Sequence, residues 1–111
     1  MPRIFYRIVH RSTPSGLAVD DFLSDAARGF APPLDPVRAR LHDGISVFNT
    51  EQQARNKAHD FPFLGSHIAA IQVEDDGPVR VERTLRGSPG HHTLWGDPEH
   101  IRSHVVSVVP V

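Results

Sequence analysis

The chain has 111 residues, the length of one ordinary domain, so residues 1–111 are expected to form a single domain. It contains no cysteine, which excludes disulfides and thiolate metal ligands. Its 12 basic and 13 acidic side chains give a net charge of −1, without the basic excess typical of nucleic-acid-binding proteins. No apolar run approaches the roughly 18 residues of a membrane span. We therefore expect a cytoplasmic protein with no membrane partner, and nucleic acid is a disfavoured partner.

The first third of the chain predicts one strand and one helix. Residues 4–9 are rich in β-branched, aromatic and aliphatic side chains, which favour a strand. Residues 11–16 have the Ser, Pro and Gly content of a turn. Apolar residues recur at three- and four-residue steps over 19–28, which predicts a helix ending at Gly29.

The middle of the chain carries the clearest local signal. Asp35, followed by a proline, predicts the start of a short helical turn. Residues 45–48 predict a second strand, with Ser46 and Phe48 on one face. Thr50 and Gln53 form a Thr-x-x-Gln capping box, which predicts a helix running to about residue 58.

The last third predicts mainly strands. Residues 68–73 and 79–83 are joined by Asp-Gly-Pro and predict a hairpin. A glycine-rich loop over 85–90 precedes a short strand at 93–95. A helical turn from Asp97 then leads to a closing strand at 105–109. Runs of strands with helices between them predict an α+β fold, a compact and mainly antiparallel sheet with two or three short helices.

Two side chains of the first strand are candidates for chemistry. Arg7 lies among apolar residues, and a guanidinium there needs a partner such as a phosphate or carboxylate, which it can bind with two parallel hydrogen bonds. An arginine on the solvent face of an edge strand is the alternative. His10 ends the strand, where a histidine can donate to a ligand or move a proton, or can simply be a surface residue.

The second strand and the capped helix offer further candidates. Ser46 could bind a ribose hydroxyl and Phe48 could stack on a flat ring, or both could belong to the core. The free N–H groups of the helix that begins after Thr50 favour an anion.

Histidine is abundant, with eight in the chain. His91 and His92 are adjacent and precede a strand, so one is expected to face inward, where it could orient a substrate or act as a base, and the other outward. His100 and His104 have the i, i+4 spacing of two zinc ligands on a helix, but a strand is expected to begin at residue 105. We therefore expect no metal site.

These segments, in this order, resemble the ADP-ribosyltransferase fold, the superfamily of poly-ADP-ribose polymerases and of ADP-ribosylating and RES-type bacterial toxins. The first strand of that fold carries an Arg or His, as residues 5–10 do here with Arg7 and His10. Its second strand carries a Ser or Tyr and runs into a helix, as Ser46 does. A Glu heads a late strand that is followed by a turn and a closing apolar strand, a layout shared by residues 92–109. His91 or His92 stands where that Glu would be.

The resemblance implies an enzyme that binds NAD and cleaves its nicotinamide–ribose bond, as an ADP-ribosyltransferase or an NAD glycohydrolase. The implied roles are Arg7 and His10 on the dinucleotide, Ser46 on the ribose, Phe48 on the nicotinamide ring and His92 on the reacting ribose or acceptor, with Thr50 and His91 also on the cofactor.

Two other hypotheses stay open beside it. One is a metal-free RNase in which His10 and His92 act as acid and base, with Arg7 on the phosphate. The other is a non-catalytic binding module that forms a homodimer through the apolar residues 105–111.

Overall fold

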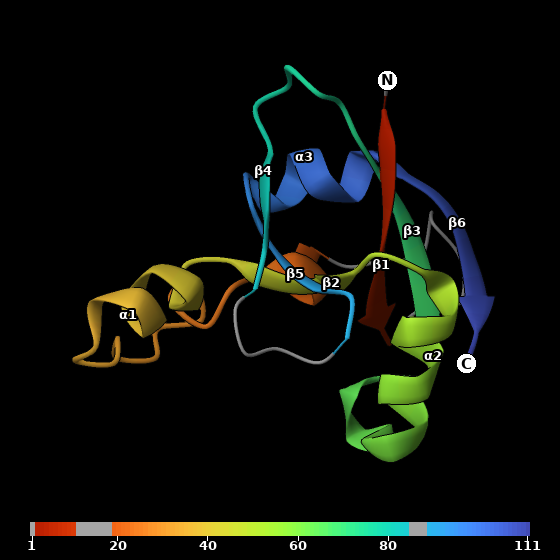
Figure 1. The fold of residues 1–111 in the computed structure, drawn as a ribbon, viewed down its shortest axis with the longest axis horizontal. Coiled ribbons are helices and arrows are strands. Elements are labelled where there is room, and N and C mark those ends of the chain that lie inside the picture. The colour runs from red at the N-terminus through yellow and green to blue at the C-terminus, as the bar shows by residue number, and fades with distance from the viewer. Residues whose placement is uncertain (1, 11–18, 85–88) are drawn as a thin grey trace.

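A computed structural model describes residues 2–10, 19–84 and 89–111 and confirms the α+β fold class (Figure 1). Its centre is a six-stranded sheet with the order β4-β5-β2-β1-β3-β6, in which each pair of neighbours is antiparallel. The predicted turn at 11–16 and most of the predicted loop at 85–90 lie outside the described residues. The strands are β1 (Arg3–Val9), β2 (Ile45–Phe48), β3 (His67–Val73), β4 (Arg80–Arg83), β5 (His91–Trp95) and β6 (Val105–Pro110).

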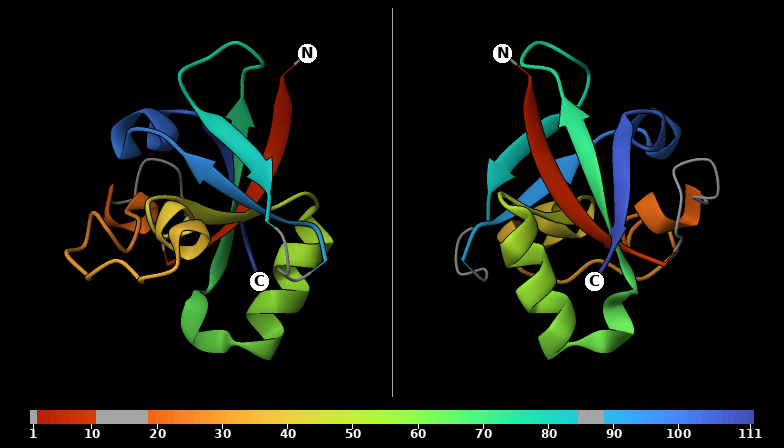
Figure 2. Two further views of the ribbon diagram at one scale, coloured as in Figure 1. Left: turned by 60° about the vertical axis from the view of Figure 1, so that its left-hand side comes forward. Right: turned by 90° about the vertical axis from the view of Figure 1, so that its right-hand side faces the viewer.

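Each face of the sheet carries an apolar cluster, and helical segments cover both clusters. Helix α3 (Pro98–Ser103) and the 3₁₀ turn η2 (Val19–Phe22) pack on the larger cluster, which includes Phe5, Val47 and Leu94. Helix α2 (Glu51–Asp60) packs on the other face, over Phe48 and Ile68. Figure 2 shows α2 and α3 on opposite sides of the sheet. Helix α1 (Pro36–His42) contains no buried residue and projects from the body at the left of Figure 1.

The predicted capping box is present at the start of α2. The Thr50 hydroxyl accepts from the Gln53 N–H at 3.1 Å, and the Gln53 side chain accepts from the Thr50 N–H at 3.2 Å. Aspartates cap the other two helices, Asp35 for α1 and Asp97 for α3. Each cap satisfies N–H groups that the first helical turn leaves without a partner.

The two caps should differ in their effect on global stability. Thr50→Ala should lower the free energy of unfolding by about 1 kcal/mol, because α2 is packed through Ala54 and Ala58 and cannot fray without exposing the core. Asp35→Ala is the matched control and should have a smaller effect, since α1 buries nothing. Urea denaturation followed by circular dichroism measures both. Equal losses would mean that α1 contributes as much to the cooperative fold as α2.

The predicted hairpin of residues 68–73 and 79–83 is wrong. Strand β3 pairs with β1 and β6, whereas β4 pairs with β5 at the opposite edge of the sheet. The segment around Gly77 is therefore a crossover between the two sides of the sheet. An Asp-Gly-Pro turn reverses the chain locally, but it does not determine which strand the next one joins.

The predicted helix over 19–28 is also wrong. Only Val19–Phe22 is helical, as a 3₁₀ turn, and turns follow it as far as Gly29, which has φ +90°. The Ser24 hydroxyl accepts from the Ala27 N–H at 3.1 Å, a local bond that competes with helix continuation. Phe22 is the only residue of the predicted apolar stripe that is fully buried, so a longer helix would gain little stability from packing.

Candidate functional site

The sheet opens between its two central strands. Strands β1 and β2 share a single paired position, Tyr6 with Phe48, whereas β1 and β3 pair along their whole length. Beyond that position the backbone groups of β2 need other partners. Arg7 supplies one, because its Nη1 donates to the Ser46 carbonyl at 2.8 Å.

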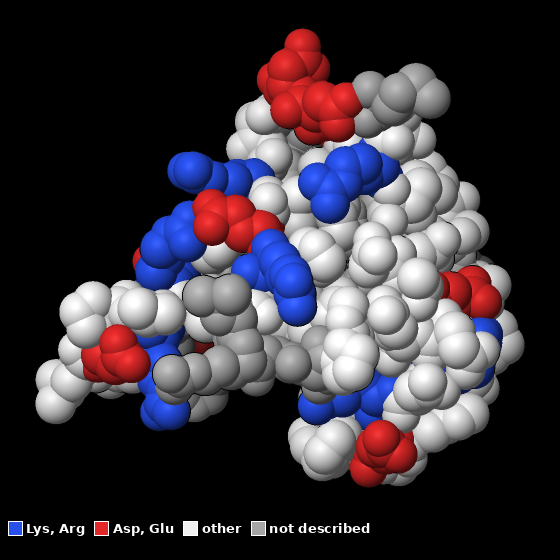
Figure 3. Space-filling view, viewed as in Figure 1, with Lys and Arg blue, Asp and Glu red and all other residues white. Residues whose placement is uncertain are grey.

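A cavity of about 570 Å³ lies at this opening. We define the arm as residues 23–43, which contain α1. In Figure 3 the outline of the molecule is recessed between the arm at the lower left and the α2 lobe at the lower right. The cavity lies within the ~300–1,000 Å³ range of small-molecule sites. Its lining comes from β1 (Arg7, Ile8), the arm and its end (Leu23, Ser24, Asp25, Leu41, His42, Gly44), β2 (Ile45, Ser46, Phe48), α2 and the turn after it (Lys57, Leu64), and β5 (His91).

Arg7 is held firmly at the cavity wall. Its Nε donates to the Asp21 carbonyl at 2.7 Å and its Nη1 to Ser46, and these are the two hydrogen bonds of its guanidinium among the described residues. Burial lowers the pKa of Arg7 to about 10, against the attraction of the Asp21 carboxylate, so the side chain stays cationic at neutral pH. The expected partner of Arg7 was an anion, yet the partners found are two backbone carbonyls.

His91 and His92 lie on opposite faces of the sheet, as expected for adjacent residues of a strand. His91 pairs with Phe48 in the β2–β5 register, packs against the Phe48 ring at 5.4 Å and lines the cavity. His92 pairs with Val47, packs against the Phe5 ring at 5.2 Å and is not among the lining residues. His91 is therefore the histidine of this pair that a ligand in the cavity would meet.

The electrostatic setting of His91 favours its neutral form. Burial lowers the pKa of His91, and the nearby charges of Lys57 and His92 lower it further. Its Nδ1 is buried and has no hydrogen-bond partner among the described residues. A neutral imidazole can accept a hydrogen bond or a proton from a ligand group through a nitrogen that faces the cavity.

Ser46 and Phe48 share the cavity face, as the two-residue period predicts. Phe48, however, is only 3% exposed and belongs to the cluster under α2. A ring this deeply buried has no open face on which a flat ligand ring could stack.

Four other candidate residues lie outside the cavity lining. His10 is exposed at the end of β1, and its backbone N–H donates to Asp21 Oδ1 at 3.4 Å. Thr50 is occupied as the cap of α2. His100 and His104 have ring centroids 4.2 Å apart, and no group of three or more His, Asp or Glu residues in the described ranges is placed to hold a metal ion.

Sequence reasoning identified four of the 14 described lining residues of the cavity and missed the other ten. Asp25 and His42 come from the arm, and Lys57 lies one helical turn before the end of α2. No local pattern identifies them, because the fold of the arm and the packing of α2 bring them to β1 and β2. Asp25 is the one carboxylate in the described lining, and its charge contributes to holding Arg7 cationic.

The chain was also compared with known proteins. No protein-family model, curated protein or solved structure matches it. No helix in the ranges described here is long and apolar enough to cross a membrane.

Proposed function

We propose that the cavity binds NAD and that the protein cleaves the bond between its nicotinamide and ribose. The observation that carries this proposal is the convergence of Arg7, Ser46 and His91, from three distant segments, on one cavity of about 570 Å³. These are residues that the resemblance to the ADP-ribosyltransferase fold assigned to the dinucleotide.

The charges of the lining suit the two ends of the ligand. The pyrophosphate is an anion, and Arg7 and Lys57 are the cationic side chains of the described lining. Nicotinamide in NAD is a cationic ring, and Asp25 supplies a carboxylate in the same cavity. Small polar groups such as Ser46 suit the ribose hydroxyls.

Cleavage needs no covalent nucleophile in this proposal. The C1′–N bond breaks, its electron pair neutralises the nicotinamide nitrogen, and positive charge develops on the ribose. Asp25 and the dipoles of the lining stabilise that charge. Water, or the hydroxyl or amine of an acceptor, adds to C1′ and releases a proton. Neutral His91 replaces His92 as the proton acceptor, because His91 lines the cavity.

Calorimetric titration with NAD and chromatographic detection of released nicotinamide test the proposal. We expect micromolar to millimolar binding and release that falls at least tenfold in His91→Gln and Asp25→Asn. His92→Gln is the matched control, since His92 is the neighbour of His91 on the other face of the sheet, and should change release little. Absence of both binding and release at millimolar NAD would refute the proposal.

The structure gives less support to the two alternatives, the RNase and the homodimeric binding module. An RNase would need His10 and His92 near Arg7, yet neither histidine lines the cavity that contains Arg7. Strand β6 is the last strand on one side of the sheet within the described residues, the position that a dimer would need, but its pairing with β3 is irregular at Ala70/Ile71 and it ends at Pro110. Bulges and prolines on edge strands hinder pairing with another chain.

A further inference from the structure

The arm forms one wall of the cavity although little packing holds it. Helix α1 has no buried residue, and Phe30, Leu34 and Val37 are exposed. Segments that bury few apolar contacts open at low free energy. Residues 23–25 and 41–42 nevertheless line the cavity. The position of the arm must therefore be determined by contacts other than hydrophobic packing.

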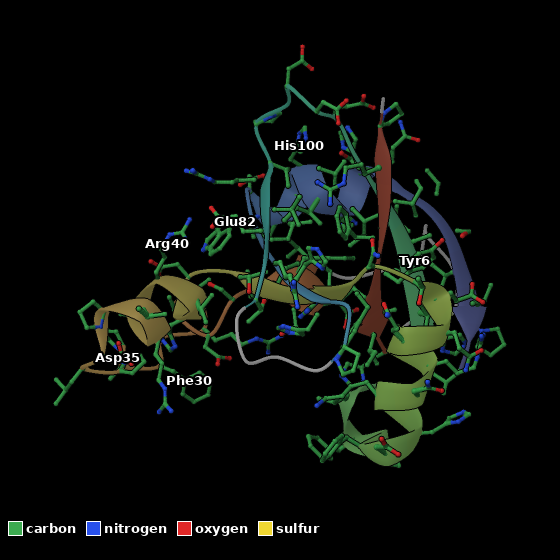
Figure 4. All side chains as sticks on the ribbon, viewed as in Figure 1. Tyr6, Phe30, Asp35, Arg40, Glu82 and His100 are labelled. Carbon is green, nitrogen blue, oxygen red and sulfur yellow. The ribbon has the colours of Figure 1, made fainter. Side chains whose placement is uncertain are left out.

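A cluster of three side chains connects the arm to the sheet. Arg40 of α1 donates through both Nη1 and Nη2 to the two carboxylate oxygens of Glu82 on β4, the first at 3.1 Å. The Arg40 guanidinium also lies over the Trp95 ring of β5, with its carbon 4.4 Å from the ring centroid. Trp95 Nε1–H in turn donates to the Arg40 carbonyl at 3.0 Å. In Figure 4 the labelled side chains of Arg40 and Glu82 lie against each other.

Two further features stiffen this connection. Arg80 Nε lies 3.0 Å from Glu82, so the carboxylate is shared by two guanidinium groups. Where the arm returns to the sheet, a Cβ on Gly44 would lie 2.4 Å from the Thr93 methyl and 3.0 Å from Trp95 Nε1. The backbone therefore passes close against Trp95 just after the cavity-lining residues of α1.

The arrangement differs from an isolated surface ion pair. A single exposed pair contributes little to stability, because water screens it and both side chains lose freedom. Here the planar guanidinium is fixed by a two-point carboxylate contact and an aromatic face, and the backbone carbonyl of the same residue accepts from Trp95. The residue so fixed directly precedes Leu41 and His42 of the cavity wall.

We propose that Arg40, Glu82 and Trp95 form a latch that positions the arm and thereby sets the shape of the cavity for its ligand. None of the three is among the described lining residues, so each acts as a positioning residue through Leu41 and His42. The latch itself does not depend on the ligand. Its effect on NAD affinity rests on the proposed function.

Glu82→Gln tests the latch by removing charge while keeping size. Glu99→Gln is the matched control, because Glu99 makes an exposed ion pair with Arg102 on α3, away from the arm. Hydrogen exchange should be about fivefold faster for amides of residues 37–43 in Glu82→Gln, while β1 and β3 amides are unchanged. Emission of Trp95, the one tryptophan of the chain, should change in Glu82→Gln and not in Glu99→Gln.

A second variant and a binding measurement complete the test. Trp95→Phe retains an aromatic ring for Arg40 but removes the N–H donor and part of the ring surface, and it should also speed exchange in the arm. NAD affinity should fall several-fold in Glu82→Gln with an unchanged melting temperature, which a merely structural weakening would lower. Exchange in the arm that stays at the wild-type rate in both variants would overturn the latch. If the wild-type protein fails to bind NAD, the proposed function is wrong. The hydrogen-exchange result still shows whether the latch positions the arm.

Discussion

Replacing Arg7 with methionine should lower the free energy of unfolding by roughly 2–4 kcal/mol. Methionine keeps the unbranched stem and removes the guanidinium. The carbonyls of Asp21 and Ser46 then lose their charged donor. Asp21, a residue that is 8% exposed, loses the cation beside its carboxylate. Urea denaturation measures the change, and Arg3→Met on the exposed end of the same strand is the control, with an expected loss below about 1 kcal/mol.

The same variant should weaken NAD binding at least tenfold, because the pyrophosphate of the proposed ligand loses its half-buried cationic partner. Arg7→Lys separates the two roles of the residue. A lysine keeps the positive charge but lacks the rigid fork that spans two carbonyls, so it should restore part of the NAD affinity and less of the stability. If Arg7→Met unfolds at the same urea concentration as the wild-type protein, the two carbonyl contacts contribute nothing to stability. Other groups would then stabilise β2 where it is not paired with β1.

Much of the fold could be predicted from local chemistry. The strand at 45–48 and the helix after Thr50 were predicted correctly. The signals for both, a capping box and a two-residue alternation, depend only on residues close together in the sequence. The pairing of 79–83 with 68–73 was predicted wrongly, because the partner of a strand is chosen by burial across the whole sheet. The same limit explains the helix predicted over 19–28, whose apolar periodicity lacks a surface to pack against.

In the candidate site, too, local sequence patterns predict some features, whereas others depend on contacts between distant segments. Alternation along a strand predicts that one of His91 and His92 faces the cavity side, but the choice depends on the β2–β5 register, which pairs His91 with Phe48. Asp25 was out of reach, because no short pattern predicts that a turn in the arm comes near β1. The position of Arg7 among apolar residues predicts that its guanidinium needs a partner, but the two backbone carbonyls that it binds could be found only in the three-dimensional structure.

Gly90→Ala should cost roughly 2–3 kcal/mol, from two additive causes. Gly90 has φ +75°, a left-handed conformation in which any residue with a Cβ is strained by about 1–2 kcal/mol. Its Cβ would also lie 1.8 Å from Gln53 Oε1. Gln53 could swing away, but its Oε1 accepts from the Thr50 N–H, so the movement breaks half of the capping box at a cost of about 1 kcal/mol.

Gly29→Ala provides a matched control for this change. Gly29 has a similar φ of +90°, and nothing lies within 4 Å of its Cβ position, so alanine there should show the backbone strain alone. The difference between the two variants in urea denaturation isolates the contact with Gln53. The double variant Gly90→Ala/Gln53→Ala should then be less destabilised than the sum of its single changes, because removing the Gln53 amide also removes the clash.

The consequence for the site follows from the bonds of Gly90. Its carbonyl accepts from the Asn49 N–H at 2.9 Å, which ties the end of β2 to the residue before His91. His92 Nδ1 lies 2.9 Å from the same oxygen. A displaced Gly90 therefore moves His91 relative to Phe48, and nicotinamide release should fall in Gly90→Ala beyond what its lower stability explains, when it is measured well below the unfolding temperature. Release at the wild-type rate in a destabilised Gly90→Ala protein would mean that the position of His91 does not matter to the reaction, and would return the proton-accepting role to another residue of the cavity.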